Sequence, residues 1–124
     1  MMEKAPQIAA AMRMDRLIDS WERGEDRILR GAPHVIVAHA QRTIGPAAAA
    51  CTIALTYLEL AAYSVGLGTC WAGYFNAAAI SYPPMIEALQ LPQGHQCYGA
   101  MMVGYPKYEF HRIPLRKEPT VIWR

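Results

Sequence analysis

The sequence predicts a single domain that combines α-helices with β-strands. Two apolar runs rich in strand-forming residues, His34–Ala40 and Gln96–Tyr105, predict strands. Between them the Ala-rich segment Pro46–Val65 predicts one long helix. The chain has 124 residues, which suits one domain that buries about 65% of its unfolded surface.

The N-terminal segment from Pro6 to about Arg23 predicts an amphipathic helix, because its apolar residues recur near helical spacing. The i,i+4 pairs Asp19–Arg23 and Asp26–Arg30 are interpreted as a solvated charged face. Gly24 and Gly31 interrupt the segment, and Pro33 begins a new element.

The run His34–Ala40 is continuously apolar between its histidines, which is typical of a strand buried on both faces. His34 and His39 lie five residues apart, so a strand directs them to opposite faces. They are therefore interpreted as structural histidines, and no metal site is expected.

Gly45–Pro46 predicts the start of the long helix, and Gly66 predicts its left-handed end. The helix is apolar all round, so it must be enclosed on every side. Because 124 residues offer little to enclose it, a subunit interface and hence a homodimer is expected. The segment is also the best membrane candidate, but its Ala, Thr and Ser content and its lack of basic anchors predict a buried helix and no membrane partner.

Gly66–Phe75 carries three glycines in eight residues, with aromatic residues among and after them. This composition predicts a tight loop whose backbone closely approaches a flat group. Asn76–Ile80 is expected to be a short helical or irregular piece, Pro83–Leu89 a helix, and Leu91–Gly94 a turn.

The segment after Pro106 is charged and contains further prolines, so it is expected to run extended over a surface. Its end, Thr120–Trp123, reads as a short strand.

The net charge of +2, with basic and acidic residues interspersed, argues against nucleic-acid binding. The cysteines, Cys51, Cys70 and Cys97, are odd in number and lack C-x-x-C spacing, which argues against a disulfide framework, a zinc knuckle or an iron–sulfur cluster. No secretory signal is visible at the N-terminus, and reduced thiols in the cytoplasm are expected.

Five motifs in order, together with the Ala-rich helix, resemble the C-terminal part of the FMN-dependent nitroreductase family. They are Arg30–Val37, Gly66–Trp71, Leu89–His95, Met102–Pro106 and Arg116–Pro119. The resemblance covers nearly all of residues 25–124 and is closest to the branch in which a ferredoxin-like domain precedes the nitroreductase domain. Residues 1–124 are accordingly predicted to form one partial nitroreductase-like domain, truncated at its N-terminus and without that preceding domain.

The resemblance implies an α+β fold, with an antiparallel-dominated sheet flanked by helices, in an intertwined homodimer with two FMN sites at the interface. It also implies hydride transfer from NAD(P)H to the flavin and then to a nitroaromatic or quinone-like acceptor, in a ping-pong cycle.

By position, the resemblance assigns Trp71, Ala72 and Gly73 to the loop that faces the flavin ring, with an N–H near Ala72 or Gly73 directed at flavin N5. Arg116 and Lys117 match the basic position that contacts the FMN phosphate. Arg112 is a weaker candidate for the same role. The tail, residues 107–124, is expected to pack on the partner subunit.

The family's N-terminal arginine motif and its Asn-containing loop have no counterpart in Met1–Arg23. The alternative function is therefore a truncated, non-catalytic dimeric binding or structural module that has lost tight flavin binding. A third possibility, thiol chemistry at Cys70, is disfavoured because no adjacent base or resolving cysteine is evident.

Overall fold

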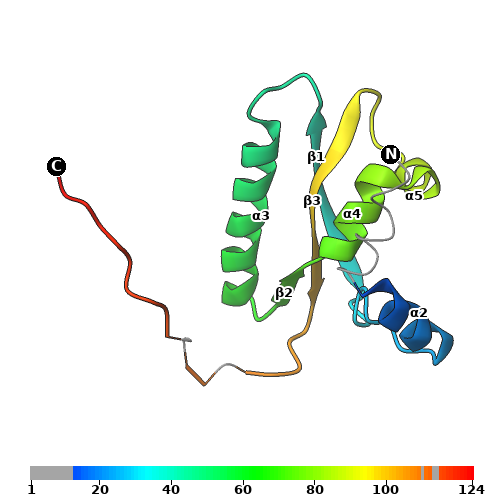
Figure 1. Ribbon diagram of the computed structural model, residues 1–124, viewed down its shortest axis with the longest axis horizontal. Helices are drawn as coiled ribbons and strands as arrows, with labels where there is room; N and C mark the ends of the chain where they lie inside the picture. Colours follow the sequence, from blue (N-terminus) through cyan, green and yellow to red (C-terminus); the bar gives the residue numbers. More distant parts are fainter. Residues whose placement is uncertain (1–12, 110, 113–114) are drawn as a thin grey trace.

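The computed structural model describes residues 13–109, 111–112 and 115–124. They contain both helices and strands, and confirm the α+β class (Figure 1). In chain order they are α2 (Met14–Glu22), β1 (His34–Gln41), α3 (Ala47–Ser64), β2 (Gly68–Trp71), α4 (Gly73–Ser81), α5 (Pro83–Leu89) and β3 (His95–Gly104).

The three strands form one antiparallel sheet in the order β1-β3-β2. Along β1, His34 pairs with Val103 at one end and Gln41 with His95 at the other. The strands predicted over His34–Ala40 and Gln96–Tyr105, and the helices predicted over Pro46–Val65 and Pro83–Leu89, are thus confirmed to within one residue at each end. The central strand β3 corresponds to the strand predicted over Gln96–Tyr105.

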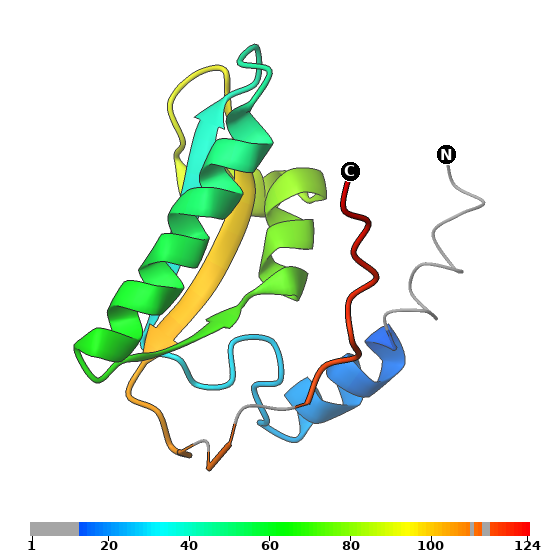
Figure 2. The same ribbon diagram turned by 90° about the vertical axis from the view of Figure 1, so that its left-hand side faces the viewer.

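Helices cover both faces of this sheet. Figures 1 and 2 show α3 on one face and α4 with α5 on the other. Residues of β3 are therefore buried on both sides, with Cys97, Ala100 and Met101 almost inaccessible to solvent. The prediction that His34–Ala40 is buried on both faces was wrong, because β1 lies at the side of the described sheet and exposes His34, Ile36 and His39.

At Gly99 the helix α3 lies tightly against the sheet. A Cβ at this position would lie 2.7 Å from Leu55 Cδ1 and 3.5 Å from Trp71 Cζ3. Leu55 is only 2% exposed and has little room to move. A glycine in the middle of β3 therefore allows the helix to sit directly on the strand.

The segment Gly66–Phe75 is not one loop, as the sequence had suggested. Gly66 ends α3 in the left-handed conformation, with φ of +75°, and the Leu67 N–H donates to the Ala62 carbonyl. Residues 68–71 then form β2, which pairs with β3, and α4 begins at Gly73, three residues earlier than expected. Pairing with β3 supplies hydrogen bonds that overcome the weak strand propensity of a glycine-containing segment.

One stripe of α3 is buried, formed by Ala47, Cys51, Leu55 and Ala62. The opposite stripe, Ile53, Tyr57 and Leu60, is exposed, and Tyr57 retains 71% of its accessible surface. The expected enclosure on every side is thus not achieved within one chain. By length and composition α3 could also cross a membrane, but its buried stripe packs on the sheet.

The two ends of the chain also differ from expectation. α2 begins at Met14, after Arg13 in the left-handed conformation, and residues 6–12 of the predicted helix lie outside the described residues. Thr120–Trp123 is exposed and has no neighbouring strand, so it does not form the predicted strand. A strand needs a hydrogen-bonding partner, and the described sheet offers none to this segment.

Gly99→Ala is expected to destabilise the domain by about 1–3 kcal/mol, because the new methyl overlaps Leu55 in a closed site. Gly45→Ala is the matched control, since a Cβ there meets nothing within 4 Å, and it should change stability by less than about 0.5 kcal/mol. Urea unfolding of the two variants measures both effects. Equal stabilities would contradict the tight contact of α3 with β3.

Candidate functional site

The junction between β2 and α4 brings Trp71, Ala72 and Gly73 together in a strand-to-helix turn. Trp71 is the last residue of β2, Ala72 precedes α4, and Gly73 is its first residue. No side chain caps this end of α4. The first N–H groups of the helix therefore point outward with partial positive charge.

The structure separates the roles of these three residues. Ala72 is 2% exposed, and its N–H donates to the Ala100 carbonyl at 2.9 Å, so this N–H is already occupied. Trp71 packs toward α3, with Cζ3 near Gly99 beside Leu55. Of the two candidate donors, Gly73 is the one whose N–H no hydrogen bond among the described residues occupies.

Space above Gly73 is open. A Cβ built there would meet no atom within 4 Å, and the residue is exposed. A flat ring could therefore approach the backbone closely at this point, with the Gly73 N–H as a neutral donor. Because of this opening, the junction has room for a flat ring such as the isoalloxazine of a flavin.

The predicted phosphate-binding residues lie elsewhere. Arg112, Arg116 and Lys117 are exposed on the C-terminal tail, which has no regular secondary structure. Figure 1 shows this tail leaving β3 and running outward on the α3 side of the molecule. Within one chain the fold does not bring these cations to the β2–α4 junction.

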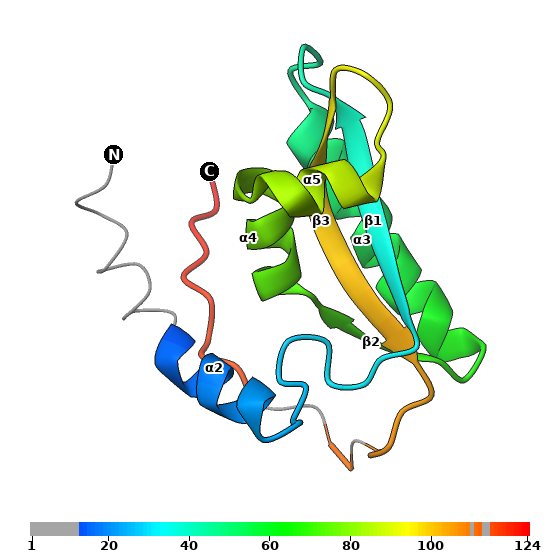
Figure 3. The same cartoon turned by 90° about the vertical axis from the view of Figure 1, so that its right-hand side faces the viewer.

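A different group of cations does lie beside the junction. We call it the arginine cavity, a hollow of about 430 Å³. Its described lining consists of Arg13, Arg16, Leu17, Asp26, Arg27, Arg30 and Tyr74. Tyr74 follows Gly73 in α4, so the cavity adjoins the open backbone at Gly73. Figure 3 shows α2 and the segment after it below α4.

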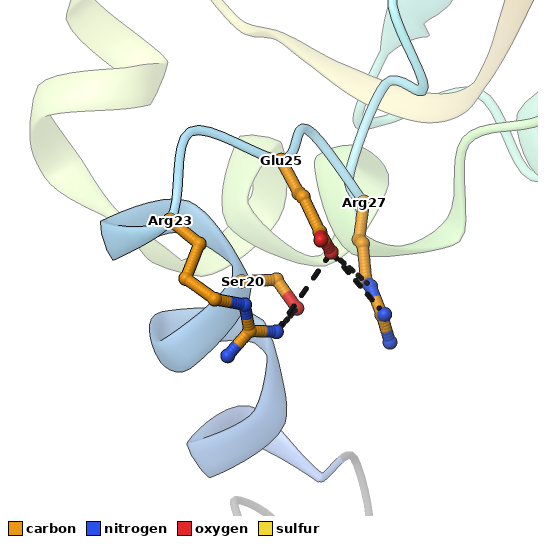
Figure 4. Close-up of polar contacts among 4 residues, drawn as sticks. All are labelled: Ser20, Arg23, Glu25 and Arg27. Carbon is orange, nitrogen blue, oxygen red and sulfur yellow. Dashed lines mark hydrogen bonds and ion pairs between the residues drawn. The ribbon is translucent and has the colours of Figure 1, made fainter.

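The charges of this cavity are only partly compensated. Among the described residues, the ion pairs are those of Glu25 with Arg23 and Arg27, at 3.8 and 3.3 Å (Figure 4). Arg23 also donates to Ser20 Oγ. Asp19–Arg23 and Asp26–Arg30 do not form ion pairs, because α2 ends at Glu22 and Arg23 turns to Glu25. All four residues are exposed, as expected for a solvated charged face.

Asp26 has a structural role at the rim of the cavity. Its carboxylate accepts the backbone N–H groups of Leu29, Gly31 and Ile28. These hydrogen bonds, of Leu29 and Gly31 above all, lower the pKa of Asp26 below its ordinary value. The bonded carboxylate shapes the loop that carries Arg27 and Arg30.

Two arginines of the cavity have unusual backbones. Arg13 and Arg30 have φ values of 51° and 55°, in the left-handed region that residues other than glycine seldom occupy. Such strain, of order 1–3 kcal/mol per residue, persists where surrounding structure enforces it and is concentrated at functional sites. The sequence did not reveal this cluster, because Arg13 and Arg16 are separated from Arg27 and Arg30 by the end of α2.

The thiols offer no catalytic arrangement. Cys70 is exposed on β2, and among the described residues its thiol hydrogen-bonds only to the Trp71 carbonyl oxygen, at 3.7 Å. Cys97 is buried, and burial raises the pKa of its thiol, which donates to Asn76 Oδ1. No group of three or more His, Cys, Asp or Glu side chains that could hold a metal ion occurs in the described part of the chain.

The fold resembles those of several solved proteins. A nitroreductase with bound FMN from Bacteroides fragilis matches with a TM-score of 0.66 at 21% identity, over 84% of this chain and 59% of that one. An FMN-dependent nitroreductase from Clostridium difficile matches with a TM-score of 0.56 at 23% identity, over 75% of this chain and 57% of that one. A nitroreductase-like protein from Bacillus cereus gives 0.52 at 24% identity, over 86% and 55%.

The chain therefore spans between half and two thirds of the length of these structures. No protein with a curated description matches the sequence. The family model for the nitroreductase family matches residues 1–105, which is most of the chain. The chain thus belongs to the nitroreductase family.

Proposed function

We propose that this chain acts as an FMN-dependent oxidoreductase of the nitroreductase type, which uses NAD(P)H to reduce nitroaromatic or quinone-like acceptors. Family membership supports a flavin oxidoreductase in general. The main structural support for the proposal is the backbone at Gly73, which is open to solvent and is not capped by a side chain.

The flavin ring is proposed to lie against Gly73. FMN, when bound, supplies the hydride transfer between NAD(P)H and the acceptor. The protein supplies the Gly73 N–H as a fixed donor toward the ring, while Ala72 and Trp71 hold that donor in place. Ala72 does so through its hydrogen bond to Ala100, and Trp71 through its contacts near Gly99 and Leu55.

The phosphate of the cofactor has two candidate binding sites. Arg116 and Lys117, with Arg112, are proposed to reach it from the partner's tail, as the resemblance implies. The arginine cavity is the candidate within the same protomer, since it adjoins Gly73 through Tyr74. Guanidinium groups suit phosphate because their planar, forked donors match its oxygens.

A homodimer is proposed to bury the exposed stripe of α3. Ile53, Tyr57 and Leu60 form an apolar surface that one chain leaves uncovered. The extended tail, residues 107–124, would then lie along the partner. Isologous pairing of α3 with α3 would put each tail near the other protomer's site.

A non-catalytic dimeric module is the second candidate. It is favoured by the position of the tail cations, which the single chain does not bring to the junction. Loss of two charge-assisted hydrogen bonds to a phosphate would weaken binding on the order of 10²–10⁴-fold. A flavin titration separates the two candidates, because the module would carry no flavin absorbance once unbound FMN is removed.

Gly73→Val should weaken FMN binding at least tenfold, because its side chain fills the space proposed for the ring. The fold should be retained, since a Cβ there meets nothing within 4 Å. Flavin fluorescence quenching measures affinity, and Gly45→Val is the matched control. Unchanged FMN affinity in Gly73→Val would place the ring elsewhere.

Paired charge removals should identify the phosphate site. Arg116→Ala with Lys117→Ala is expected to reduce FMN affinity about 10²–10⁴-fold if the tail binds the phosphate. Arg16→Ala with Arg30→Ala should do so if the arginine cavity binds it. Riboflavin, which lacks the phosphate, is the control ligand, and its affinity should be equal in all variants. If neither pair alters FMN affinity, both phosphate assignments are wrong.

Tyr57→Arg should convert the dimer to monomers, because a charge would be placed in the centre of the apolar stripe. Sedimentation velocity measures the change. Tyr82→Arg is the matched control, since Tyr82 is also an exposed tyrosine but lies between α4 and α5, on the other side of the sheet. A dimer that persists in Tyr57→Arg would exclude this stripe as the interface.

A further inference from the structure

Two histidines far apart in the sequence meet at one end of the sheet. His39 of β1 and His95 of β3 have ring centroids 5.1 Å apart, with planes inclined at 58°. Their Nδ1 atoms lie 3.0 Å apart. The side chains are solvent-accessible, so an ion from solution could reach both rings.

A register shift creates this pair. Ala38 faces Gly99 but His39 faces Cys97, so Tyr98 is an extra residue in β3. If the register continued without this shift, His39 would face Tyr98. His95 would then point to the other side of the sheet from His39, because side chains alternate along a strand. With it, His39 and His95 share one face as diagonal neighbours.

The paired nitrogens have a spacing suited to one metal ion. Ligand nitrogens bind transition metals at about 2.0–2.1 Å, so two of them at a right angle lie about 2.9 Å apart, and at a tetrahedral angle about 3.4 Å. The observed 3.0 Å is close to the right-angled value. Right-angled nitrogen ligands are typical of tetragonal Cu²⁺ and Ni²⁺, whereas Zn²⁺ prefers the tetrahedron.

We propose that His39 and His95 chelate a divalent transition-metal ion of tetragonal preference, Ni²⁺ or Cu²⁺, through their facing Nδ1 atoms. In the described part of the chain no third His, Cys, Asp or Glu joins them, so water completes the coordination. Without metal, one Nδ1–H donates a hydrogen bond to the other Nδ1. In the metal complex both Nδ1 atoms present a lone pair to the ion, so the proton of the donating ring moves to Nε2 of the same ring.

The surroundings permit such an ion. His95 also lines a cavity of about 300 Å³ between the strand ends and the helices α4 and α5. Arg42 and Glu87 line that cavity with opposite charges, which offset one another. The cavity is separate from the Gly73 opening and from the arginine cavity, so this proposal is independent of flavin binding.

Titration of the tag-free protein with NiCl₂, followed by calorimetry, tests the proposal. One ion per chain should bind, and His39→Gln or His95→Gln should each weaken it at least tenfold. His34→Gln is the matched control, an exposed histidine of the same strand on the other face. Cys70→Ser controls for binding to the exposed thiol. Neither control should alter Ni²⁺ affinity.

A second readout guards against a folding defect in the variants. Ni²⁺ should raise the thermal midpoint of the wild-type protein, because it bridges β1 and β3 in the folded state only. That shift should disappear in each His variant, while the midpoint without metal stays near that of wild type. Equal Ni²⁺ affinity in wild type and both His variants, or loss of binding in Cys70→Ser alone, would overturn the proposal.

Discussion

The central position of β3 is the constraint on which the rest of the structure depends. This strand pairs with β1 on one side and β2 on the other, and helices cover both of its faces. Gly99 allows α3 to sit on it, while Ala100 and Met102 form the opposite core with Ala72. A change in β3 would therefore alter both strand pairings and both helix contacts together.

The candidate flavin-facing backbone is a consequence of this arrangement. Because β2 pairs with β3, the chain enters α4 at a fixed place, and Ala100 takes the N–H of Ala72. Gly73 is then the first residue of the helix, open to solvent and without a capping side chain. Rigid packing on one side of the turn thus leaves a defined donor on the other, which is the kind of preorganisation a cofactor site requires.

What the single chain leaves exposed is as informative as its core. The apolar stripe of α3 and the cations of the tail both lie outside the packed body. The chain also spans only 55–59% of the solved structures it resembles. The proposed homodimer rests on the first two of these features, the exposed apolar stripe and the exposed tail.

Local sequence was sufficient for the long helix, the two main strands and the glycine that ends α3, because periodicity, β-propensity and left-handed backbone preference act over a few residues. The order of five sequence motifs also indicated the family.

Tertiary structure decided the remaining features. β2 exists because β3 pairs with it, and β1 is half-exposed because it lies at the side of the described sheet. The arginine cavity and the His39–His95 pair depend on a chain reversal and a one-residue register shift, and such long-range geometry leaves no periodic pattern in the sequence.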